Sequence, residues 1–385
     1  MGAQKALDRS GAPGYHAVIP NREGEAVRIL DLRKAIDEID SQILRLLNRR
    51  AELALEVGRL KAEQNLDYHA PQREEEIYAR LAAENAGPFP SQAVRPVFRE
   101  VISACLSLEH SLRVAYLGPR ATFSHLAAME RFGLSAQFLA MRSIGEVFAE
   151  VEKGNADYGV VPVENSTEGV VSHTLDMFLD SSLLICGEVV VEAALHLLGK
   201  ASSLAGVRQI YSHPHAIAAA RKWLEANSQH IPVVETSSTA AAAEIAASEP
   251  GAAAIASELA AGLYGLTILQ RRIEDLPNNM TRFLIIGRKA SPPSATDKTS
   301  ILFSIKDRVG ALYRMLQPFA EHQINLTKIE SRPSKKQVWE YVFYVDLEGH
   351  ASEPRVQRAL ETLRDECIFL KVLGSYPKAR LPKEV

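Results

Sequence analysis

The chain has 385 residues and a net charge of -3 at pH 7, and 24% of its residues are charged. A chain of this length holds about two to four domains, each able to bury its own core. No run of Lys and Arg suggests a nucleic-acid surface, and no apolar run reaches the roughly 18 residues that a membrane span needs. The composition therefore indicates a soluble protein whose affinity for anions depends on local sites.

The N-terminus and the cysteines indicate a cytoplasmic protein. The first twenty residues lack the apolar core of a signal peptide, so we expect residues 1–24 to form a flexible tail. Three cysteines lie far apart in apolar stretches, which is typical of reduced core thiols: Cys105, Cys186 and Cys367. The one close histidine pair, His213 and His215, has no cysteine nearby. We therefore expect no metal and no cofactor.

Residues 25–112 carry a helical pattern. Between Ile29 and Lys61 the only Gly or Pro is Gly58, and apolar residues recur three and four positions apart: Leu32, Ile36, Ile39, Ile43, Leu46, Leu47, Leu53 and Val57. This pattern predicts one long amphipathic helix, of a length usual for bundles and dimers. A second helix is expected over about 72–86 and a third over about 92–108.

Basic residues lie on the packing face of the first predicted helix. Arg50 and Lys61 are about three helical turns apart, which places them on one face. Arg33 lies about 25 Å along the axis from Arg50, so it reaches the same small ligand only from a second copy of the helix. Basic groups on a packing face need an anion. For any one of them, a solvated side chain is the alternative.

Three stretches of this segment carry a family resemblance: Leu32-Arg33 with Ile36 and Ile39, Arg49 to Gly58 with Lys61, and Arg73-Glu74. They resemble the all-helical chorismate mutases. The resemblance implies an intertwined homodimer in which Arg33 crosses from the other protomer. It also implies site roles in three groups: the carboxylates of chorismate held by Arg50 and Arg73, the ether oxygen by Lys61 and Glu109, and the hydroxyl by Glu74, with Cys105 nearby.

These residue types fit the rearrangement of chorismate to prephenate, which needs neither a nucleophile nor a proton transfer. Holding the dianion in a compact shape and stabilising charge on the breaking ether oxygen are enough. Arg suits carboxylates because its planar fork is bidentate, and Lys suits a single oxygen. Glu109 can donate to that oxygen only when it is protonated.

Residues 113–290 alternate short apolar strands with helical stretches, which predicts an α/β domain. Four strands end in polar residues at an expected helix start: Thr122 to Ser124, Asn165 to Gly169, Ser212 to His215 and Ser237 to Thr239. Free N–H groups and helix dipoles at such turns bind carboxylates. Because the same residues are the preferred N-caps, capping alone is the alternative for each. A further turn at Pro277 to Asn279 brings Thr281 and Arg282 to the mouth of a buried strand, and the five together favour one cleft.

Four motifs in this segment match one family: Tyr116 to Pro119 with Thr122 to Ser124, Val161 to Ser166, Ser212 to Pro214, and Thr281 to Phe283. They resemble prephenate dehydratase, which implies two lobes like those of type II periplasmic binding proteins, with the site between them. The resemblance implies that Thr281 is the main catalytic residue. It implies a substrate-binding set made of Thr122, Asn165, Ser212, Ser238, Arg282 and Phe283. Arg120-Ala121 and His215 depart from the family pattern.

The reaction needs little acid–base machinery. Prephenate must lose CO2 and its ring hydroxyl together to give phenylpyruvate, and the gain in aromaticity supplies much of the driving force. A Thr hydroxyl is a poor acid, so we expect Thr281 to orient or hydrogen-bond the leaving oxygen. Glu164 is a candidate for the proton donor.

Residues 291–298 are predicted to be a linker rich in Pro and Ser. After it, residues 299–385 follow the order strand, helix, strand, strand, helix, strand, with a turn at 334–336, which predicts a ferredoxin-like α+β sandwich. Two motifs lie in it: Gly310-Ala311-Leu312 and Glu330-Ser331-Arg332-Pro333. They resemble ACT domains of phenylalanine-regulated enzymes. The resemblance implies that these residues line an L-phenylalanine site between paired ACT domains, where binding shifts the dimer to a less active state.

The three resemblances together predict a bifunctional chorismate mutase and prephenate dehydratase with an ACT sensor and no nucleic-acid or membrane partner. The sequence leaves two alternatives open: a non-catalytic sensor of aromatic metabolites, and a dehydratase whose helical segment is a dimerisation device with a degenerate site. It also leaves open whether the dehydratase prefers prephenate or arogenate, and whether dimers pair into tetramers.

Overall fold

The structure, a computed structural model, describes residues 22–64, 71–305, 308–333 and 341–379. Of the expected flexible tail, residues 1–21 lie outside the described residues and 22–24 belong to a helix. The expected turn at 334–336 also lies outside them. Residues up to Leu53 and from Ala54 onward form two compact units, and each is described by itself.

The first unit contains most of helix α1 (Arg22–Glu63), which confirms the long helix expected from the apolar spacing. Its apolar residues repeat in a heptad pattern: Ile29, Leu32, Ile36, Ile39, Ile43 and Leu46. Each of these side chains is about half exposed or more, from 49% for Ile43 to 70% for Leu46. A continuous apolar stripe open to water is typical of a surface that binds another helix.

The second unit begins with the end of α1 and two shorter helices, α2 (Pro71–Glu84) and α3 (Ser91–Glu109), which pack on each other. Both agree with the predicted ranges to within two residues. Helix α3 shares a core with the domain that follows, because Leu106 packs in one apolar cluster with Tyr116 and Phe132. The Ser103 hydroxyl donates to the Phe132 carbonyl at 2.8 Å. The α3 end of the helical segment is thus fixed to that domain.

The first lobe of the α/β domain is built on a mixed sheet in the order β2-β1-β3-β11-β5, with the short β4 paired to β3. Its strands are β1 (Arg113–Leu117), β2 (Gln137–Met141), β3 (Tyr158–Asn165), β4 (Gly169–Val170), β5 (Leu184–Glu192) and β11 (Met280–Gly287). Alternating side chains bury both faces, with Val160 and Ile285 under α4 (Phe123–Phe132) and Val161 and Leu284 under α5 (Ile144–Glu152). The chain leaves this sheet after β5 and returns along β11.

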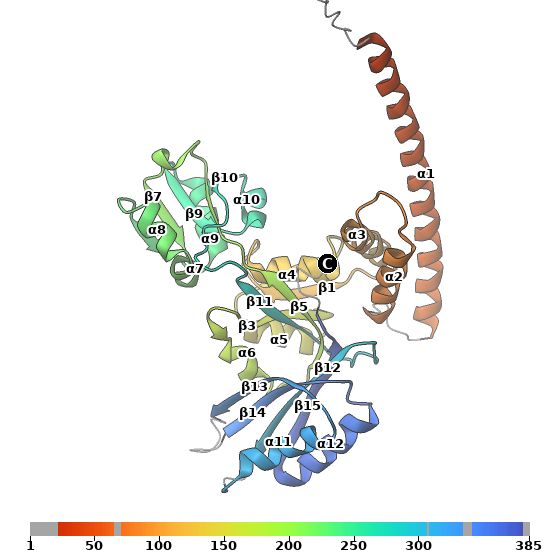
Figure 1. Cartoon of the computed structure of the whole chain (residues 1–385), viewed down its shortest axis with the longest axis vertical. Coiled ribbons are helices and arrows are strands. Elements are labelled where there is room, and N and C mark those ends of the chain that lie inside the picture. The colour runs from red at the N-terminus through yellow and green to blue at the C-terminus, as the bar shows by residue number, and fades with distance from the viewer. Residues whose placement is uncertain (1–21, 65–70, 306–307, 334–340, 380–385) are drawn as a thin grey trace, which may run out of the picture. The chain divides into compact units, whose positions relative to one another are not determined.

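The second lobe lies between those two crossings and has the sheet order β10-β6-β9-β7-β8. Its strands are β6 (His196–Gly199), β7 (Gln209–Ser212), β8 (Val233–Glu235), β9 (Ala252–Ala256) and β10 (Thr267–Gln270). Its helices are α7 (Pro214–Ala219), α8 (Arg221–Asn227), α9 (Thr239–Ser248) and α10 (Glu258–Tyr264). Alanines on α9 and β9 form much of its core, which lets helix and strand pack closely. Figure 1 shows the two lobes joined by β5 and β11, as predicted.

The C-terminal domain is a four-stranded antiparallel sheet in the order β13-β14-β12-β15, with two helices on one face. Its elements are β12 (Asp297–Ile305), α11 (Ala311–Glu321), β13 (Leu326–Pro333), β14 (Tyr341–Glu348), α12 (Pro354–Glu366) and β15 (Cys367–Pro377). The element order confirms the predicted ferredoxin-like sandwich.

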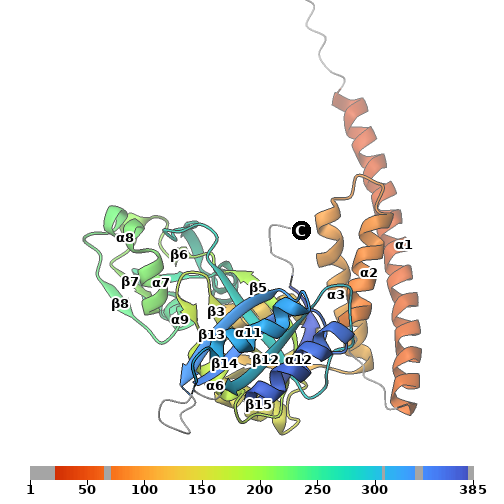
Figure 2. The same ribbon diagram turned by 60° about the horizontal axis from the view of Figure 1, so that its bottom comes forward.

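The other face of this C-terminal sheet packs on the first lobe. Tyr344, Leu373 and Tyr376 belong to the same buried cluster as Phe148 and Ile185 of the first lobe. At Gly374 the backbone comes so close that an added Cβ would lie 2.2 Å from the Ile185 carbonyl oxygen. Figures 1 and 2 show α11 and α12 on the outer side of the sheet, away from the first lobe. The two domains therefore share one core.

Candidate active sites

The ends of β3 and β11 bring two predicted dehydratase residues together. Asn165 and Thr281 are directly opposite each other in this antiparallel pair. The Asn165 amide nitrogen donates to the Thr281 hydroxyl oxygen at 2.8 Å and to the Asn279 side-chain oxygen at 2.7 Å. The Asn165 side-chain oxygen accepts from the backbone N–H groups of Thr167 and Glu168, at 2.9 and 3.1 Å. Because these N–H groups can only donate, they fix which way the Asn165 amide points.

This arrangement leaves the Thr281 proton available. Since Asn165 donates to the Thr281 oxygen, the Thr281 hydroxyl is free to donate its own hydrogen to a substrate oxygen. Asn279 is 8% exposed and helps to hold Asn165 in place. The sequence predicts only a turn at Asn279. Its signal was the Asn-Asn pair two residues before the predicted catalytic Thr.

The segment after β3 is a hairpin turn, not the helix start that the sequence suggested. β3 ends at Asn165, and Gly169–Val170 pairs back on it as β4 before α6 (Ser172–Met177) begins. Gly169 has a φ of +86°, which a residue with a side chain rarely adopts. The anion-binding helix N-terminus expected at this point is therefore absent, and Asn165 acts through its side chain.

Arg282 does not face the same way as Thr281, because successive side chains of a strand point to opposite faces. Its guanidinium binds three carboxylates, Glu188 at 2.6 Å, Asp346 at 2.7 Å and Glu164 at 3.0 Å, and its side chain is 9% exposed. The prediction that Arg282 contacts substrate directly is wrong for this geometry. Burial alone would lower the pKa of Arg282, but Tyr376, Asp346 and Glu188 outweigh it and raise the pKa, so the residue stays charged.

Two further predictions on these strands need correction. Burial raises the pKa of Glu164, but the ion pairs with Lys328 and Arg282 outweigh it, so the net shift of the Glu164 pKa is downward. A carboxyl group held ionised in this way is a poor proton donor, which contradicts the candidate role of Glu164. Phe283 is 1% exposed in the core beneath α4. It is a packing residue with no access to substrate.

The hydroxyl groups predicted in the other turns are used by the backbone. Thr122 and Ser238 are N-caps that accept from the backbone N–H groups of His125 and Ala241. Ser212 is fully buried, and its hydroxyl donates to the Ile255 carbonyl at 2.7 Å. The three side chains therefore serve local capping or packing, which was the alternative for each. Direct substrate contact by the Ser212 side chain is contradicted.

The two lobes meet beside Asn165. Glu168, in the turn after β3, forms an ion pair with His215 at the start of α7. Ser212 lies three residues before His215, at the end of β7. The turn that holds Asn165 therefore faces the strand end that carries Ser212, so these two predicted regions lie across one interlobe boundary.

The helical site is only partly assembled in the single chain. The Lys61 ammonium lies 3.6 Å from the Glu109 carboxylate, whose side chain is 9% exposed. One Glu109 oxygen, Oε2, is buried without a hydrogen-bond partner. Gly58 makes this close packing feasible, since a Cβ there would lie 2.9 Å from the Glu109 Cγ. Cys105 is buried one turn before Glu109 on α3.

Other predicted residues of the helical site take other partners. Arg73 pairs with Glu76 on the surface, with 65% of its side chain exposed. Glu74 pairs with Arg131 of α4 at 3.0 Å. Arg33 and Arg50 lie in the separate N-terminal unit, the first exposed and the second half-buried. Within the described part of one chain, Arg73 and Glu74 do not converge with Lys61, contrary to expectation.

The predicted effector motifs of the C-terminal domain lie at a helix start and on an edge strand. Gly310 has a φ of +73° directly before Ala311 and the exposed Leu312 of α11. Glu330, Ser331 and Pro333 lie on β13, the edge strand of the sheet. Arg332 points elsewhere, because its guanidinium binds Asp176 of α6 at 3.0 Å. Its predicted place in an effector site is therefore contradicted by its contacts.

Three family models match the chain: Chorismate mutase type II over residues 32–110, Prephenate dehydratase over 114–291 and ACT domain over 299–365. A bifunctional chorismate mutase/prephenate dehydratase of Aquifex aeolicus is 54% identical over 355 residues, which cover 91% of this chain and 98% of the relative. The corresponding protein of Stutzerimonas stutzeri is 47% identical over 93% of this chain and 100% of its own length. The chain belongs to the bifunctional chorismate mutase/prephenate dehydratase family. The predicted family is thereby confirmed.

Solved structures match the dehydratase and ACT parts of this family member. Prephenate dehydratase from Arthrobacter aurescens in complex with L-Phe aligns with a TM-score of 0.65 and 33% identity, covering 69% of this chain and 90% of its own. A chain described as a novel type of quorum quenching acylase aligns with a TM-score of 0.64 and 32% identity, covering 71% of this chain and 100% of its own. Since one fold carries both descriptions, the reaction has to be argued from the site.

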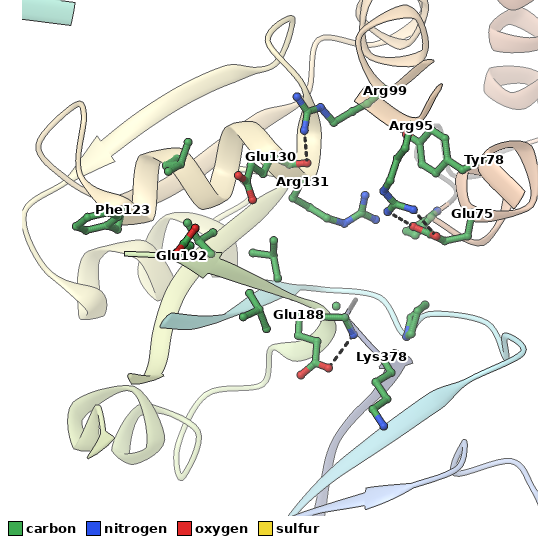
Figure 3. A pocket seen from close by; sticks show the side chains of 18 of the residues that line it. Glu75, Tyr78, Arg95, Arg99, Phe123, Glu130, Arg131, Glu188, Glu192 and Lys378 are labelled. Atoms are coloured by element: carbon green, nitrogen blue, oxygen red, sulfur yellow. Dashed lines mark hydrogen bonds and ion pairs between the residues drawn. The ribbon is translucent and has the colours of Figure 1, made fainter. Parts of the chain in front are cut away.

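A large cavity lies away from the predicted sites of this family. It measures about 1520 Å³ and is lined by residues of α2, α3, α4 and β5, but by none of the predicted site residues (Figure 3). Its arginines already have carboxylate partners, such as Arg95 with Glu75 at 2.8 Å and Arg272 with Glu192 at 2.7 Å. Paired guanidiniums are poor candidates for binding a dianion, so size alone does not make this cavity an active site.

Three further observations concern membranes, metals and thiols. No helix in the described ranges is long and apolar enough to cross a membrane. Among the residues that the structure describes, no group of three or more His, Cys, Asp or Glu could hold a metal ion. The three cysteines are free thiols.

Proposed function

We propose that this chain rearranges chorismate to prephenate at the helical site and converts prephenate to phenylpyruvate at the ends of β3 and β11. It is an enzyme with chorismate mutase and prephenate dehydratase domains, and L-phenylalanine inhibits it through the ACT domain. The observation that carries the dehydratase assignment is the Thr281–Asn165 pair, with the Thr281 oxygen held by Asn165 and its proton free. Family membership supports both reactions.

The dehydratase step follows from this pair. The bond from the ring carbon to its carboxylate breaks and releases CO2, and its electron pair forms the new ring double bond as the C–O bond breaks. The departing oxygen takes up a proton and leaves as water. Thr281 donates a hydrogen bond to that oxygen as negative charge develops on it, and Asn165 keeps the hydroxyl in the required direction. On the opposite face, two lysines and an arginine form ion pairs with Glu164, Glu188 and Asp346.

The mutase step uses the Lys61–Glu109 pair. The ammonium of Lys61 stabilises charge on the breaking ether oxygen, and Glu109, whose Oε2 lies 3.6 Å from that ammonium without a hydrogen bond, borders the same point. Both side chains are largely removed from water, which strengthens such interactions. Arg50 and further arginines bind the carboxylates of chorismate. A single chain does not bring these further arginines near Lys61.

A second copy of the chain completes this site. The apolar stripe of α1 is the proposed contact, because its heptad spacing matches a helix–helix seam. In that homodimer Arg33 reaches the partner's site. Exposed Leu312 and the open edge of β13 support a further pairing of ACT domains, with L-phenylalanine between Gly310, Leu312 and Glu330. The free thiols suit the cytoplasm, where we place the enzyme.

The decisive experiment separates the effect of the Thr281 hydroxyl group from the effect of the shape of the side chain. Thr281→Val keeps the branched side chain of a strand residue but removes the hydroxyl, and Thr281→Ser keeps the hydroxyl. On prephenate we expect Thr281→Val to lower dehydratase kcat/KM by about 100-fold to 1000-fold. We expect Thr281→Ser to keep most of the activity, and both variants to keep wild-type mutase turnover. Full dehydratase activity in Thr281→Val would refute the site. Arogenate is assayed beside prephenate to settle the preferred substrate.

A further inference from the structure

Two cross-strand pairs stand side by side at the ends of β3 and β11. Thr281 is opposite Asn165, and the next residue, Arg282, is opposite Glu164. Because neighbouring strand residues face opposite ways, the first pair faces the proposed dehydratase site and the second faces the ACT sheet. The contacts agree with this, since Arg282 binds Asp346 of β14 and Tyr376 of β15.

The second pair belongs to a network of charges that are mostly buried, with Glu164 the most exposed member at 33%. It holds three cations and three anions: Arg282, Lys298 and Lys328 with Glu164, Glu188 and Asp346. The Glu188 side chain is 1% exposed. Removing one member of such a network leaves an uncompensated buried charge, so its geometry is strongly determined. We call these six residues the charge network.

The pairing of β3 with β11 is irregular near this end of the strands. The pairing between β3 and β11 shifts register between Arg282 and Phe283, so that Phe283 is opposite Pro162 and Val163 is left over as a bulge. Pairing with β5 and β4 also holds the residues of the two terminal pairs. The side chains of the charge network add a constraint directly beside the bulge.

The edge strand β13 joins this network to the predicted effector motif. Lys328 of β13 binds Glu164, which is adjacent to Asn165. Four residues later, Arg332 binds Asp176 of the first lobe. Glu330, a predicted effector residue, lies between these two contacts on the same strand. A ligand that shifts β13 must therefore strain contacts to the strand that carries Asn165.

We propose that Arg282 and Glu164 are positioning residues for the Thr281–Asn165 pair, and that Lys328 makes their alignment sensitive to the effector. The inference rests on the proposed dehydratase site. In this arrangement the ACT sheet contacts β3 and β11 on the face opposite the Thr281–Asn165 pair. An effector that favours a different placement of β13 lowers turnover by moving Glu164, with no contact to substrate.

The first test uses variants of the pair that keep size and, for Arg282, charge. Arg282→Lys removes the forked guanidinium, and a misplacement of about 1 Å costs about 100-fold in rate, so dehydratase kcat should fall by about that factor. KM for prephenate should stay near the wild-type value. Glu164→Gln should give a smaller loss of the same kind. Mutase turnover of the full chain, measured on the same samples, reports that each variant is folded.

The possible results separate the roles. A raised KM with normal kcat would mean that Arg282 binds substrate, and equal loss of both activities would mean a general structural role. Either result overturns the inference, as does wild-type dehydratase kcat in both variants. Thr281→Val is assayed in parallel. If it is fully active, the proposed site fails, whereas an inactive Thr281→Val beside normal Arg282 and Glu164 variants refutes only the positioning role.

The second test addresses the effector. Lys328→Met should lower dehydratase turnover without phenylalanine less than Arg282→Lys does, and should raise the phenylalanine concentration for half-inhibition by at least about fivefold. Lys371→Met is the matched control. Lys371 also links the ACT sheet to the first lobe, through the carbonyls of Phe178 and Ser181, which are not part of the charge network. Equal inhibition of Lys328→Met and wild type, or an equal shift in both lysine variants, would overturn the coupling role.

Discussion

The two proposed sites of this chain are built in different ways. The dehydratase pair lies on neighbouring strands of one sheet, and its hydrogen bonds are complete within a single chain. The mutase residues are spread along helices, and in the described part of the second unit Lys61 lies beside Glu109 while Arg73 stays on the surface. Backbone hydrogen bonds between paired strands hold facing residues close together. A long helix spaces its residues along its axis, so a site on it needs residues from a second helix beside it.

The largest expected effect concerns the helical site alone. Lys61→Met should lower mutase kcat by about 100-fold to 1000-fold, because it removes the charge that stabilises the ether oxygen. Dehydratase activity on prephenate should not change. Arg59→Met, at an exposed position half a turn away on the same helix, is the control and should retain mutase activity. If Lys61→Met is as active as this control, the Lys61–Glu109 pair is not the mutase site.

A change in the α1 stripe should separate the sites through assembly. Ile39→Asp places a charge in the proposed helix–helix seam, so we expect the mass in solution to fall by about half. Mutase activity should fall with it, while much of the dehydratase activity remains. Ser41→Asp adds the same charge at an exposed position outside the seam. Light scattering coupled to size-exclusion chromatography measures both, and an unchanged mass together with unchanged mutase activity for Ile39→Asp would exclude α1 as the dimer contact.

The charge network beside the strand site should also make the free energy of unfolding depend on pH. The pKa of Glu164 is lower in the folded state than its ordinary value, so its ionisation stabilises the fold at neutral pH. That contribution is lost as pH falls through the folded-state pKa. Glu164→Gln should therefore be less stable than wild type near about pH 7, with the difference shrinking toward about pH 4. Urea unfolding at the two pH values gives the comparison, and a constant difference would argue against an ionised Glu164.

The smallest expected effect concerns the second lobe. The ion pair of His215 with Glu168 is exposed, with 69% of the His215 side chain accessible. Such pairs contribute about 0.2–1 kcal/mol, so His215→Ala should raise KM for prephenate by less than about fivefold. kcat should be unchanged. A large loss of kcat would mean that the dehydratase site depends on both lobes far more than the Thr281–Asn165 pair suggests.

The sequence predicted the elements well and the side-chain directions poorly. The 3- and 4-residue spacing of α1 predicted that helix, because a local pattern encodes it. Thr281 and Asn165 were predicted as site residues from the family resemblance of their motifs. The partners of Arg282 could not be predicted, since Asp346 and Tyr376 are 64 and 94 residues away in the chain. The same motif that marked Thr281 therefore suggested a substrate contact for Arg282 that the ACT sheet takes instead.

Local reasoning also failed where two structures share one signal. A polar run after a strand starts either a helix or a hairpin, and Asn165 to Gly169 proved to be a hairpin turn because β4 pairs back on β3. Ser212 is a buried hydroxyl that binds a backbone carbonyl, a role that no pattern distinguishes from a ligand contact. Such positions depend on tertiary packing, which a single sequence does not display.

Mixing of inactive variants tests the contrast between the two sites most directly. We expect Arg33→Ala and Lys61→Met each to be inactive as mutases. Exchange of subunits between them restores one intact site in each mixed dimer. At equal amounts about half of the dimers are mixed, which gives about a quarter of the wild-type activity. Thr281→Val and Asn165→Ala, mixed in the same way, should restore no dehydratase activity, because both residues belong to one chain. Restored dehydratase activity, or no restored mutase activity after verified exchange, would contradict the account.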